Sequence, residues 1–133
     1  MGNGKEDSCL EWIVSNPNLI GEELSTVSHT LLPRYWKLKG ETHPRKLCDL
    51  IFVFYDGSAL AVELKATISE RPVAKKQLKS SYDFLRIVRG IESVRAKIVY
   101  YGEQPFSYED FNCELVGNDR LLIKYHDSRD NPQ

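Results

Sequence analysis

The densest hydrophobic pattern in the chain lies between residues 48 and 65, which read CDLIFVFYDGSALAVELK. Two apolar runs of strand length flank an Asp-Gly pair, and this arrangement predicts a β-hairpin. Asp49 stands at the entrance of the first run, and Glu63 and Lys65 stand at the exit of the second. Because charged groups cost free energy to bury, charges at the ends of two central strands need a physical explanation.

Helical periodicity predicts two helices. The first covers roughly residues 5–15 and stops before Asn16-Pro17, and its apolar positions are Cys9, Leu10, Ile13 and Val14. The second covers residues 71–89, with Pro72 suited to its first turn and Gly90 suited to its end. Its apolar stripe consists of Ala74, Leu78, Leu85 and Val88.

The remaining pattern predicts short strands. Residues 25–38 predict an edge strand or two short pieces, broken by Pro33 and closed by Gly40. Residues 96–101 predict a strand, residues 107–111 predict a short helical turn, and a pair of strands is expected at 113–116 and 121–125 around Gly117-Asn118. We expect residues 1–126 to form a single domain and residues 127–133 to be a disordered tail.

This order of elements predicts a fold of the α/β class, more closely α+β, with an αβββαβ core. In this fold a mixed central sheet is flanked by helices, and a small C-terminal β appendix follows the core. The connection through residues 71–89 is long enough for a crossover. The right-handed rule for such crossovers therefore places residues 96–101 parallel to the strand that carries Glu63.

The length of the hairpin turn decides whether the charged ends can act together. Side chains alternate between the two faces of a strand, so Glu63 and Lys65 share one face. A two-residue turn would put Asp49 on the opposite face, whereas an odd loop brings it to the same face. We therefore predict a three-residue loop of residues 56–58, with Asp49 opposite Lys65.

The apolar pattern favours the same register. One dense core would then form on the uncharged face from Leu50, Phe52, Phe54, Leu60, Val62 and Leu64. The charged face carries the small residues Ala59 and Ala61. We expect the helix of residues 5–15 to approach closely over them.

The composition describes an ordinary globular chain, because 41% of its 133 residues are hydrophobic and 28% are charged. The first eight residues contain no apolar segment and the longest apolar runs are strand-sized. We therefore expect no signal peptide, no membrane association and a cytoplasmic location. The three cysteines, Cys9, Cys48 and Cys113, lack the paired spacing of a zinc site or a disulfide framework, so we expect them to be small buried side chains.

Charge is segregated along the chain, although the net charge is only −1. Residues 65–97 hold nine lysines and arginines against three acids, which suggests a strip facing phosphates; a solvated helix face is the alternative. The basic residues that we expect beside a nucleic acid are Arg45, Lys46, Arg71, Lys75, Lys76 and Lys79. Tyr35 and Trp36 could stack on bases nearby, and packing in the core is the alternative.

Two carboxylates and an ammonium group at the end of a sheet form a set of groups suited to hydrolysis. Asp49 and Glu63 could hold one Mg²⁺, with Mn²⁺ as a substitute, and the backbone carbonyl of Leu64 would supply a third oxygen. Lys65 would then orient the attacking water or stabilise the developing negative charge. A partly solvated salt bridge among Asp49, Glu63 and Lys65 is the competing explanation.

The spacing of these residues resembles the motif of the PD-(D/E)XK nuclease superfamily, because Asp49, Glu63 and Lys65 are separated by thirteen residues and one residue on a hairpin that a helix follows. Residues 6–90 are further similar to the nuclease domain of the NucS (EndoMS) type of DNA endonuclease. The segments that carry this similarity are residues 16–20, Asn-Pro-Asn-Leu-Ile, at the end of the first helix and Gln77-Leu78 on the second helix.

The resemblance implies a restriction-endonuclease-like core and a Mg²⁺-dependent DNA endonuclease. Asp49 and Glu63 would be metal ligands, and Lys65 would lie beside the nucleophilic water. Gln77 would be an auxiliary group near the site, with a surface glutamine as its alternative. Such nucleases also carry a glutamate on the first helix, and Glu6 is the matching position. The rival positions are Glu22 and Glu23.

The sequence also departs from the family pattern. Residues 45–48, Arg-Lys-Leu-Cys, lack the glycine and the proline that usually precede the aspartate. The separate N-terminal domain with which NucS proteins dimerise and recognise DNA is not found in these residues, so mismatch specificity does not carry over. A homodimer or a partner subunit could supply DNA recognition, and a stand-alone nuclease is the alternative. The alternative function is a catalytically silent module that binds nucleic acid or supports an assembly and keeps the nuclease fold.

Overall fold

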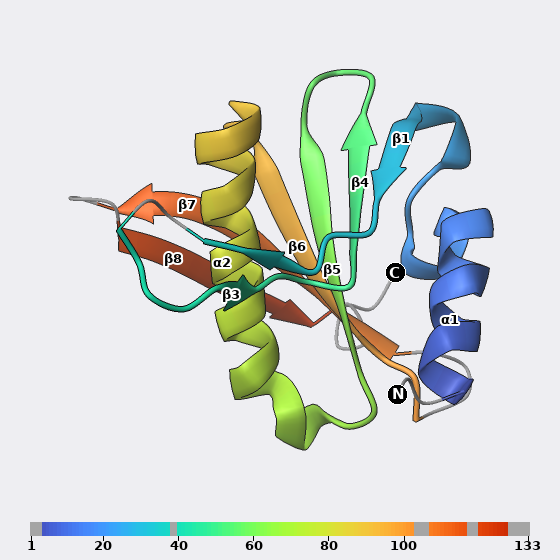
Figure 1. Ribbon diagram of the computed structural model, residues 1–133. Coiled ribbons are helices and arrows are strands. Elements are labelled where there is room, and N and C mark those ends of the chain that lie inside the picture. Colours follow the sequence, from blue (N-terminus) through green and yellow to red (C-terminus); the bar gives the residue numbers. More distant parts are fainter. Residues whose placement is uncertain (1–3, 38–39, 103–106, 117–119, 128–133) are drawn as a thin grey trace.

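A mixed β-sheet forms the centre of the structure, a computed structural model (Figure 1). Within residues 4–37, 40–102, 107–116 and 120–127, which the structure describes, this sheet has six strands in the order β1-β4-β5-β6-β7-β8. The strands are β1 (Val27–Leu31), β4 (Leu50–Phe54), β5 (Ala59–Lys65), β6 (Val94–Tyr100), β7 (Ser107–Val116) and β8 (Arg120–Asp127). The predicted α+β class with a mixed sheet is therefore confirmed.

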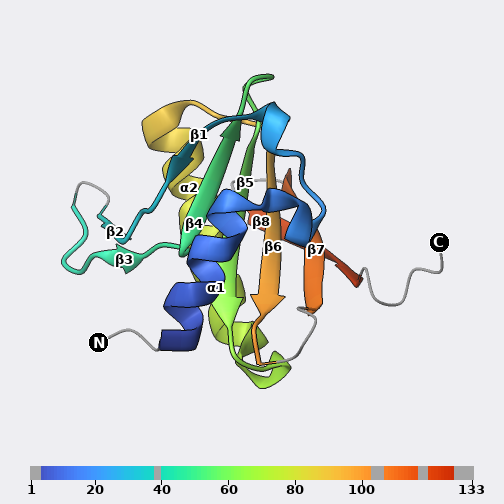
Figure 2. The same ribbon diagram turned by 90° about the vertical axis from the view of Figure 1, so that its right-hand side faces the viewer.

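Helices cover both faces of this sheet. α1 (Gly4–Ser15) lies on one face and α2 (Arg71–Arg89) lies on the other, as Figures 1 and 2 show together. Both agree closely with the predicted helices. α2 begins with Pro72 in its first turn and ends at Gly90, whose φ of 68° places it in the left-handed region that favours glycine. Val88 was expected in the apolar stripe of α2 but is 53% exposed in the last turn.

The predicted segment 25–38 is described up to residue 37, and this part contains two short strands, which was one of the two predicted alternatives. The first is β1 at the edge of the main sheet. The second, β2 (Tyr35–Trp36), pairs antiparallel with β3 (Arg45–Lys46) in a separate two-stranded ribbon. Short 3₁₀ turns complete the path of the chain, and these are η1 (Pro17–Ile20), η2 (Leu24–Thr26) and η3 (Ile68–Glu70).

β5 and β6 are parallel neighbours joined by α2, which confirms the predicted crossover. The register runs from Ala59 opposite Val94 to Lys65 opposite Tyr100. β4 pairs antiparallel with β5, so the centre of the sheet contains both kinds of pairing. The carboxyl ends of β5 and β6 therefore lie together at the same end of the sheet as the beginning of β4.

The faces of the sheet differ in side-chain size, and α1 packs on the face with the larger side chains. Cys9 and Ile13 of α1 pack with Phe52, Leu60 and Leu64, among others. The prediction that this helix covers Ala59 and Ala61 was wrong. Those alanines face α2 and pack with its Ala74 and Leu78. The crossover between β5 and β6 must lie directly over these two strands, and small side chains there let α2 approach closely.

The hairpin between β4 and β5 has an odd loop, but its register differs by two residues from the prediction. The Phe54 N–H donates to the carbonyl of Ser58, so the loop is 55–57 rather than 56–58. The cause is local: Asp56 Oδ1 accepts hydrogen bonds from the Ser58 N–H and hydroxyl and closes the loop early. The ladder pairs Leu50 with Val62, and its continuation aligns Asp49 with Glu63 rather than Lys65.

The C-terminal part of the described chain is entirely strand. The helical turn predicted at 107–111 was wrong, because these residues begin β7, which pairs with β6. The burial alternates in the period of a strand, with Ser107, Glu109 and Phe111 buried. β7 and β8 extend the main sheet, and Asp127, predicted to begin the tail, belongs to β8. Residues 128–133 and the predicted turn at Gly117-Asn118 lie outside the described residues.

Cys9 and Cys48 are buried free thiols, as predicted, and the side chain of Cys113 lies outside those described. Burial raises the pKa of the Cys48 thiol to about 12 and that of Cys9 to about 11. In the part of the chain that the structure describes, neither helix has the length and apolar character needed to cross a membrane.

Candidate active site where β4 and β5 separate

Asp49 and Glu63 lie side by side where the ladder between β4 and β5 ends. The Asp49 N–H donates to Glu63 Oε1 at 3.1 Å, and the Leu64 N–H donates to Asp49 Oδ2 at 2.8 Å. The Asp49 carboxylate thus takes the place of the Cys48 carbonyl that a continued ladder would offer to the Leu64 N–H, and the Glu63 carboxyl group binds the Asp49 N–H. Because the loop of the hairpin is odd, Asp49, Glu63 and Lys65 share the face of the sheet that α2 covers.

The backbone of Leu64 does not pair with β4, because its expected partner there binds a side chain instead. A continued ladder would pair Leu64 with Cys48, but the Cys48 N–H donates to Ser81 Oγ at 2.8 Å. The N–H and the carbonyl of one strand residue point to the same edge of the strand, so the Leu64 carbonyl points toward the β4 side of β5. The predicted third oxygen therefore lies where β4 and β5 separate, without the ladder partner that Cys48 would provide.

Glu63 is buried, and its pKa is raised to about 9. Burial is the largest cause, followed by the hydrogen bond and the charge of Asp49, while Lys65 acts in the opposite direction. Lys65 Nζ lies 3.4 Å from Glu63 Oε2. The raised pKa favours the protonated form of Glu63 at neutral pH.

Glu6 in the first turn of α1 belongs to the same neighbourhood. Partial burial and the charge of Asp49 raise its pKa, and the charges of Lys65 and Lys46 lower it. The exposed Glu11 lies elsewhere on the helix, as the helical spacing predicts. The charges that act on Glu6 thus include Asp49 and Lys65, whereas those that act on Glu22 come from Arg95 and Lys97.

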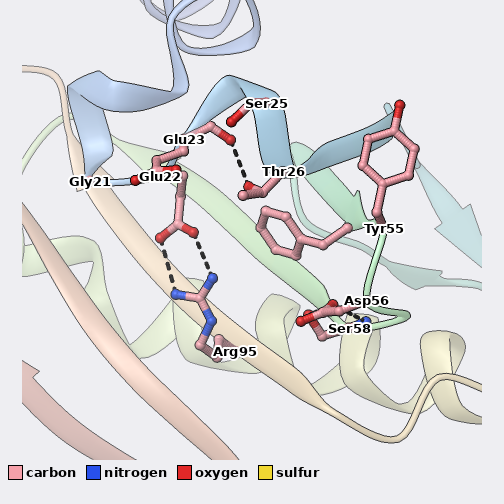
Figure 3. A pocket seen from close by; sticks show the side chains of 10 residues that line it. Gly21, Glu22, Glu23, Ser25, Thr26, Tyr55, Asp56, Ser58 and Arg95 are labelled. Carbon is pink, nitrogen blue, oxygen red and sulfur yellow. Dashed lines mark hydrogen bonds and ion pairs between the residues drawn. The ribbon is translucent and has the colours of Figure 1, made fainter.

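Glu22 and Glu23 line a pocket of about 560 Å³ at the hairpin-loop end of the sheet, away from Asp49 (Figure 3). Glu22 accepts two hydrogen bonds from Arg95, at 2.6 and 3.0 Å, and lies 2.7 Å from Lys97 Nζ. Burial acts to raise the pKa of Glu22, but the hydrogen bonds from these cations outweigh it and lower the pKa. The structure therefore uses Glu22 in an ion-pair network rather than beside Asp49.

Gln77 of α2 is buried in the layer between the helix and the sheet. Its backbone carbonyl accepts a hydrogen bond from the Ser81 hydroxyl at 2.8 Å, and Ser81 in turn holds the N–H of Cys48. Its side-chain oxygen Oε1 is buried and has no hydrogen-bond partner in the described structure. A buried amide oxygen is costly without a donor, so this position suits a water molecule or another polar ligand.

The predicted basic strip separates into ion-paired and exposed residues. Arg45 pairs with Glu41 and Asp83 at 3.0 and 2.9 Å, and Arg71 pairs with the buried Glu109. These arginines connect elements of the fold. Lys75 is half-buried, with its ammonium 5.7 Å from the centre of the Phe111 ring. The exposed lysines of the predicted set are Lys46, Lys76 and Lys79.

The donor set can be tested against the predicted Mg²⁺. Within the described residues, no three His, Cys, Asp or Glu side chains gather in a ready metal-binding arrangement. The carboxylates of Asp49 and Glu63 and the Leu64 carbonyl are all hard oxygen donors, and the buried Glu63 is an acid that a cation could deprotonate. Mg²⁺ usually keeps several waters, so two carboxylates and one carbonyl fit it.

Two residues of this region had no predicted role. Ser81 binds the Cys48 backbone. It stands four residues after Gln77 and therefore on the same face of the helix, and this spacing was the signal in the sequence that could have identified it. Tyr101 follows β6, and its N–H donates to the Lys65 carbonyl at 3.0 Å. Burial and then the charges of Glu6, Glu70 and Asp49 raise its pKa. In the sequence, the signal that could have identified Tyr101 is its position directly after β6, at the carboxyl end of the parallel strands β5 and β6.

Comparisons with models of known protein families, with characterised proteins and with solved structures gave no match.

Proposed function

We propose that the chain is a metal-dependent DNA endonuclease with a restriction-endonuclease-like core of the PD-(D/E)XK type. The observation that carries the proposal is the convergence of Asp49, Glu63 and Lys65 on one face where β4 and β5 separate. The parallel pair β5–β6 with its crossover helix, and the antiparallel β4, supply the framework for such a core. The charges of Asp49 and Lys65 act on Glu6 of α1, which adds support.

Asp49, Glu63 and the Leu64 carbonyl would hold a Mg²⁺ ion, or Mn²⁺ in its place. When bound, the ion would lower the pKa of a water molecule and neutralise charge on the phosphate. Lys65 would lie beside that water through its contact with Glu63 and stabilise negative charge that develops during attack. Glu63 must release its proton for this role, so binding of the ion and deprotonation of Glu63 are coupled.

Glu6 and Gln77 would position water rather than bind the metal directly. Glu6 is partly exposed on the α1 side of the site, where it can accept a hydrogen bond from water. Gln77 lies on the α2 side, and its buried Oε1 has no partner in the described structure. A water molecule that donates to this oxygen would remove the cost of leaving it unsatisfied.

A catalytically silent module that binds nucleic acid is the second candidate, and a specific observation favours it. Arg45 and Arg71, which were expected to face the nucleic acid, form ion pairs within the fold. Fewer cations then remain to hold phosphates, which weakens nonspecific affinity. Under either function we propose that a second copy of the chain or a partner subunit completes DNA recognition.

Cleavage assays separate the two candidates. The chain is incubated in Mg²⁺ or Mn²⁺ with supercoiled, single-stranded, mismatched and branched DNA, beside the Glu63→Ala variant. Glu23→Gln is the matched control, because Glu23 is an exposed carboxylate at the other end of the sheet. We expect cleavage by the wild type and the control and none by Glu63→Ala. Absence of cleavage on every substrate, or equal cleavage by Glu63→Ala, contradicts the endonuclease.

A further inference from the structure

The β2–β3 ribbon has two faces with different surroundings. Tyr35 pairs with Lys46, and Trp36 pairs with Arg45. Because side chains alternate along a strand, each cross-strand pair occupies one face of the ribbon. The ribbon projects from the main sheet on the side of β1 and β4 (Figure 2).

The Trp36–Arg45 face anchors the ribbon to α2. The Trp36 ring meets Phe84 edge to face, with 5.9 Å between ring centres, and Arg45 binds Asp83 at 2.9 Å. The Arg45 guanidinium also lies 5.8 Å from the centre of the Trp36 ring. A backbone hydrogen bond from the Leu47 N–H to the Arg34 carbonyl, at 2.8 Å, closes the base of the ribbon. These contacts hold the ribbon in a defined position.

The Tyr35–Lys46 face is open to solvent. Tyr35 is 62% exposed, and its neighbour Lys46 is also exposed. Exposure of a large aromatic side chain on an anchored ribbon is not explained by packing, since Trp36 already supplies the anchor. An aromatic ring that stacks on a base, next to a cation that contacts the backbone, is the combination with which proteins bind single-stranded nucleic acid.

This open face borders the candidate active site. Lys46 lies three residues before Asp49, so the chain holds their Cα atoms within about 11 Å of each other. The charge of Lys46 also lowers the pKa of Glu6. A strand of nucleic acid that contacts Lys46 would therefore pass close to the carboxylates of the site.

We propose that Tyr35 and Lys46 form a platform for an unpaired nucleotide, with Tyr35 stacking on the base and Lys46 binding its phosphate. The preferred substrate then contains a single-stranded stretch next to the cleaved bond, because a base within a duplex is already stacked and cannot reach Tyr35. This inference rests on the proposed function in taking nucleic acid as the ligand.

Binding without cleavage tests the platform. Fluorescence anisotropy in EDTA measures the Kd of the full chain for a labelled 20-nucleotide single strand and for its blunt duplex. We expect Tyr35→Ala to weaken single-strand binding roughly tenfold and duplex binding less than twofold. Tyr35→Phe should retain the affinity, because the ring rather than the hydroxyl stacks. Tyr55→Ala is the matched control, since Tyr55 is 75% exposed at the other end of the sheet.

The role of Lys46 has its own measurement. For a single strand, we expect Lys46→Ala to reduce the slope of log K against log salt by about 0.7, the contribution of one phosphate contact. Lys46→Arg should keep the slope. An unchanged slope in Lys46→Ala contradicts the phosphate contact.

The outcomes distinguish this inference from the proposed function. Equal single-strand affinities for Tyr35→Ala and Tyr55→Ala overturn the platform, even if Glu63-dependent cleavage is observed. Loss of single-strand affinity in Tyr35→Ala alone supports the platform, even if no cleavage is observed on any substrate.

Discussion

The backbone N–H of Asp49 holds the carboxyl group of Glu63 where β4 and β5 separate, and the residue after Glu63 holds the carboxylate of Asp49. Glu63 Oε1 accepts the N–H of Asp49 at 3.1 Å, and Asp49 Oδ2 accepts the N–H of Leu64 at 2.8 Å. Backbone donors therefore fix both carboxyl groups, which is the kind of support that a catalytic or metal site requires. The same arrangement places an acid with a raised pKa in the interior, and this has measurable consequences.

Replacing Glu63 with glutamine should stabilise the metal-free protein at alkaline pH. Folded Glu63 keeps its proton up to about pH 9, whereas in the unfolded chain it releases the proton near its ordinary value of 4.5. Ionisation therefore favours the unfolded state increasingly between these pH values, and the free energy of unfolding falls as pH rises. Glutamine cannot ionise, so we expect Glu63→Gln to be more stable by roughly 3–5 kcal/mol at pH 8.

Urea unfolding in EDTA at pH 4 and pH 8 measures this difference. At pH 4 the variant and the wild type should be equally stable, because Glu63 is protonated in both states. Glu23→Gln, an exposed carboxylate, should show no gain at either pH. Equal or lower stability of Glu63→Gln at pH 8 would mean that Glu63 is ionised in the folded protein.

Metal binding should displace a proton from Glu63. We expect titration calorimetry with Mn²⁺ at pH 7.5, in two buffers of different ionisation enthalpy, to show release of close to one proton per ion. Mn²⁺ should also raise the Tm of the wild type but not that of Asp49→Asn. Binding with no proton release, or an equal Tm shift in Asp49→Asn, places the ion elsewhere.

Ser81 should support the site through the backbone of Cys48. Ser81→Ala leaves the buried Cys48 N–H without its acceptor, and we expect a loss of about 1–3 kcal/mol in the free energy of unfolding. Ser80→Ala is the control, because Ser80 is the neighbouring hydroxyl and is not buried. Urea unfolding of the two variants gives the comparison. Equal stabilities would show that the Cys48 N–H finds another acceptor.

Arg71 should behave as a structural residue rather than as a phosphate contact. Its guanidinium binds the buried Glu109, which also accepts a hydrogen bond from the Tyr100 hydroxyl at 3.0 Å. Arg71→Ala removes the cation that neutralises this buried carboxylate, and we expect a loss of about 3–5 kcal/mol in the free energy of unfolding. Lys79→Ala, at an exposed position of the same helix, should change stability by less than about 0.5 kcal/mol. Chemical denaturation that shows similar losses for both contradicts this assignment.

The sequence predicted the elements whose ends carry local signals. The limits of α2 follow from Pro72 and Gly90, and the parallel pairing of β5 and β6 follows from the crossover rule. The shared face of Asp49 and Glu63 followed from an odd loop. Alternation fixes the face of a side chain, but it does not distinguish registers that differ by two residues. The hydrogen bonds from Ser58 to Asp56 decide the register, and the hydrophobic pattern does not contain them.

The errors arose where tertiary contacts overrule local preference. The start of β7 was predicted as a helical turn. Its strand pattern requires the carboxylate of Glu109 to be buried, and this burial is tolerated only because Arg71 and Tyr100 bind the carboxylate. The wrong face for α1 has a similar origin, since small residues such as Ala61 show that some helix can approach but not which one. The ion pair of Arg45 with Asp83 likewise joins residues distant in the sequence.

The most direct measurement for the proposed endonuclease is the rate at which supercoiled plasmid is nicked in Mn²⁺. Asp49→Asn, Glu63→Gln and Lys65→Met are compared with the wild type, and Glu23→Gln serves as the control for a carboxylate outside the site. We expect each of the three site variants to lose on the order of 10²-fold or more in rate, and the control to keep the wild-type rate. Nicking that persists unchanged in Glu63→Gln, or its absence in the wild type, would contradict a nuclease site at Asp49, Glu63 and Lys65.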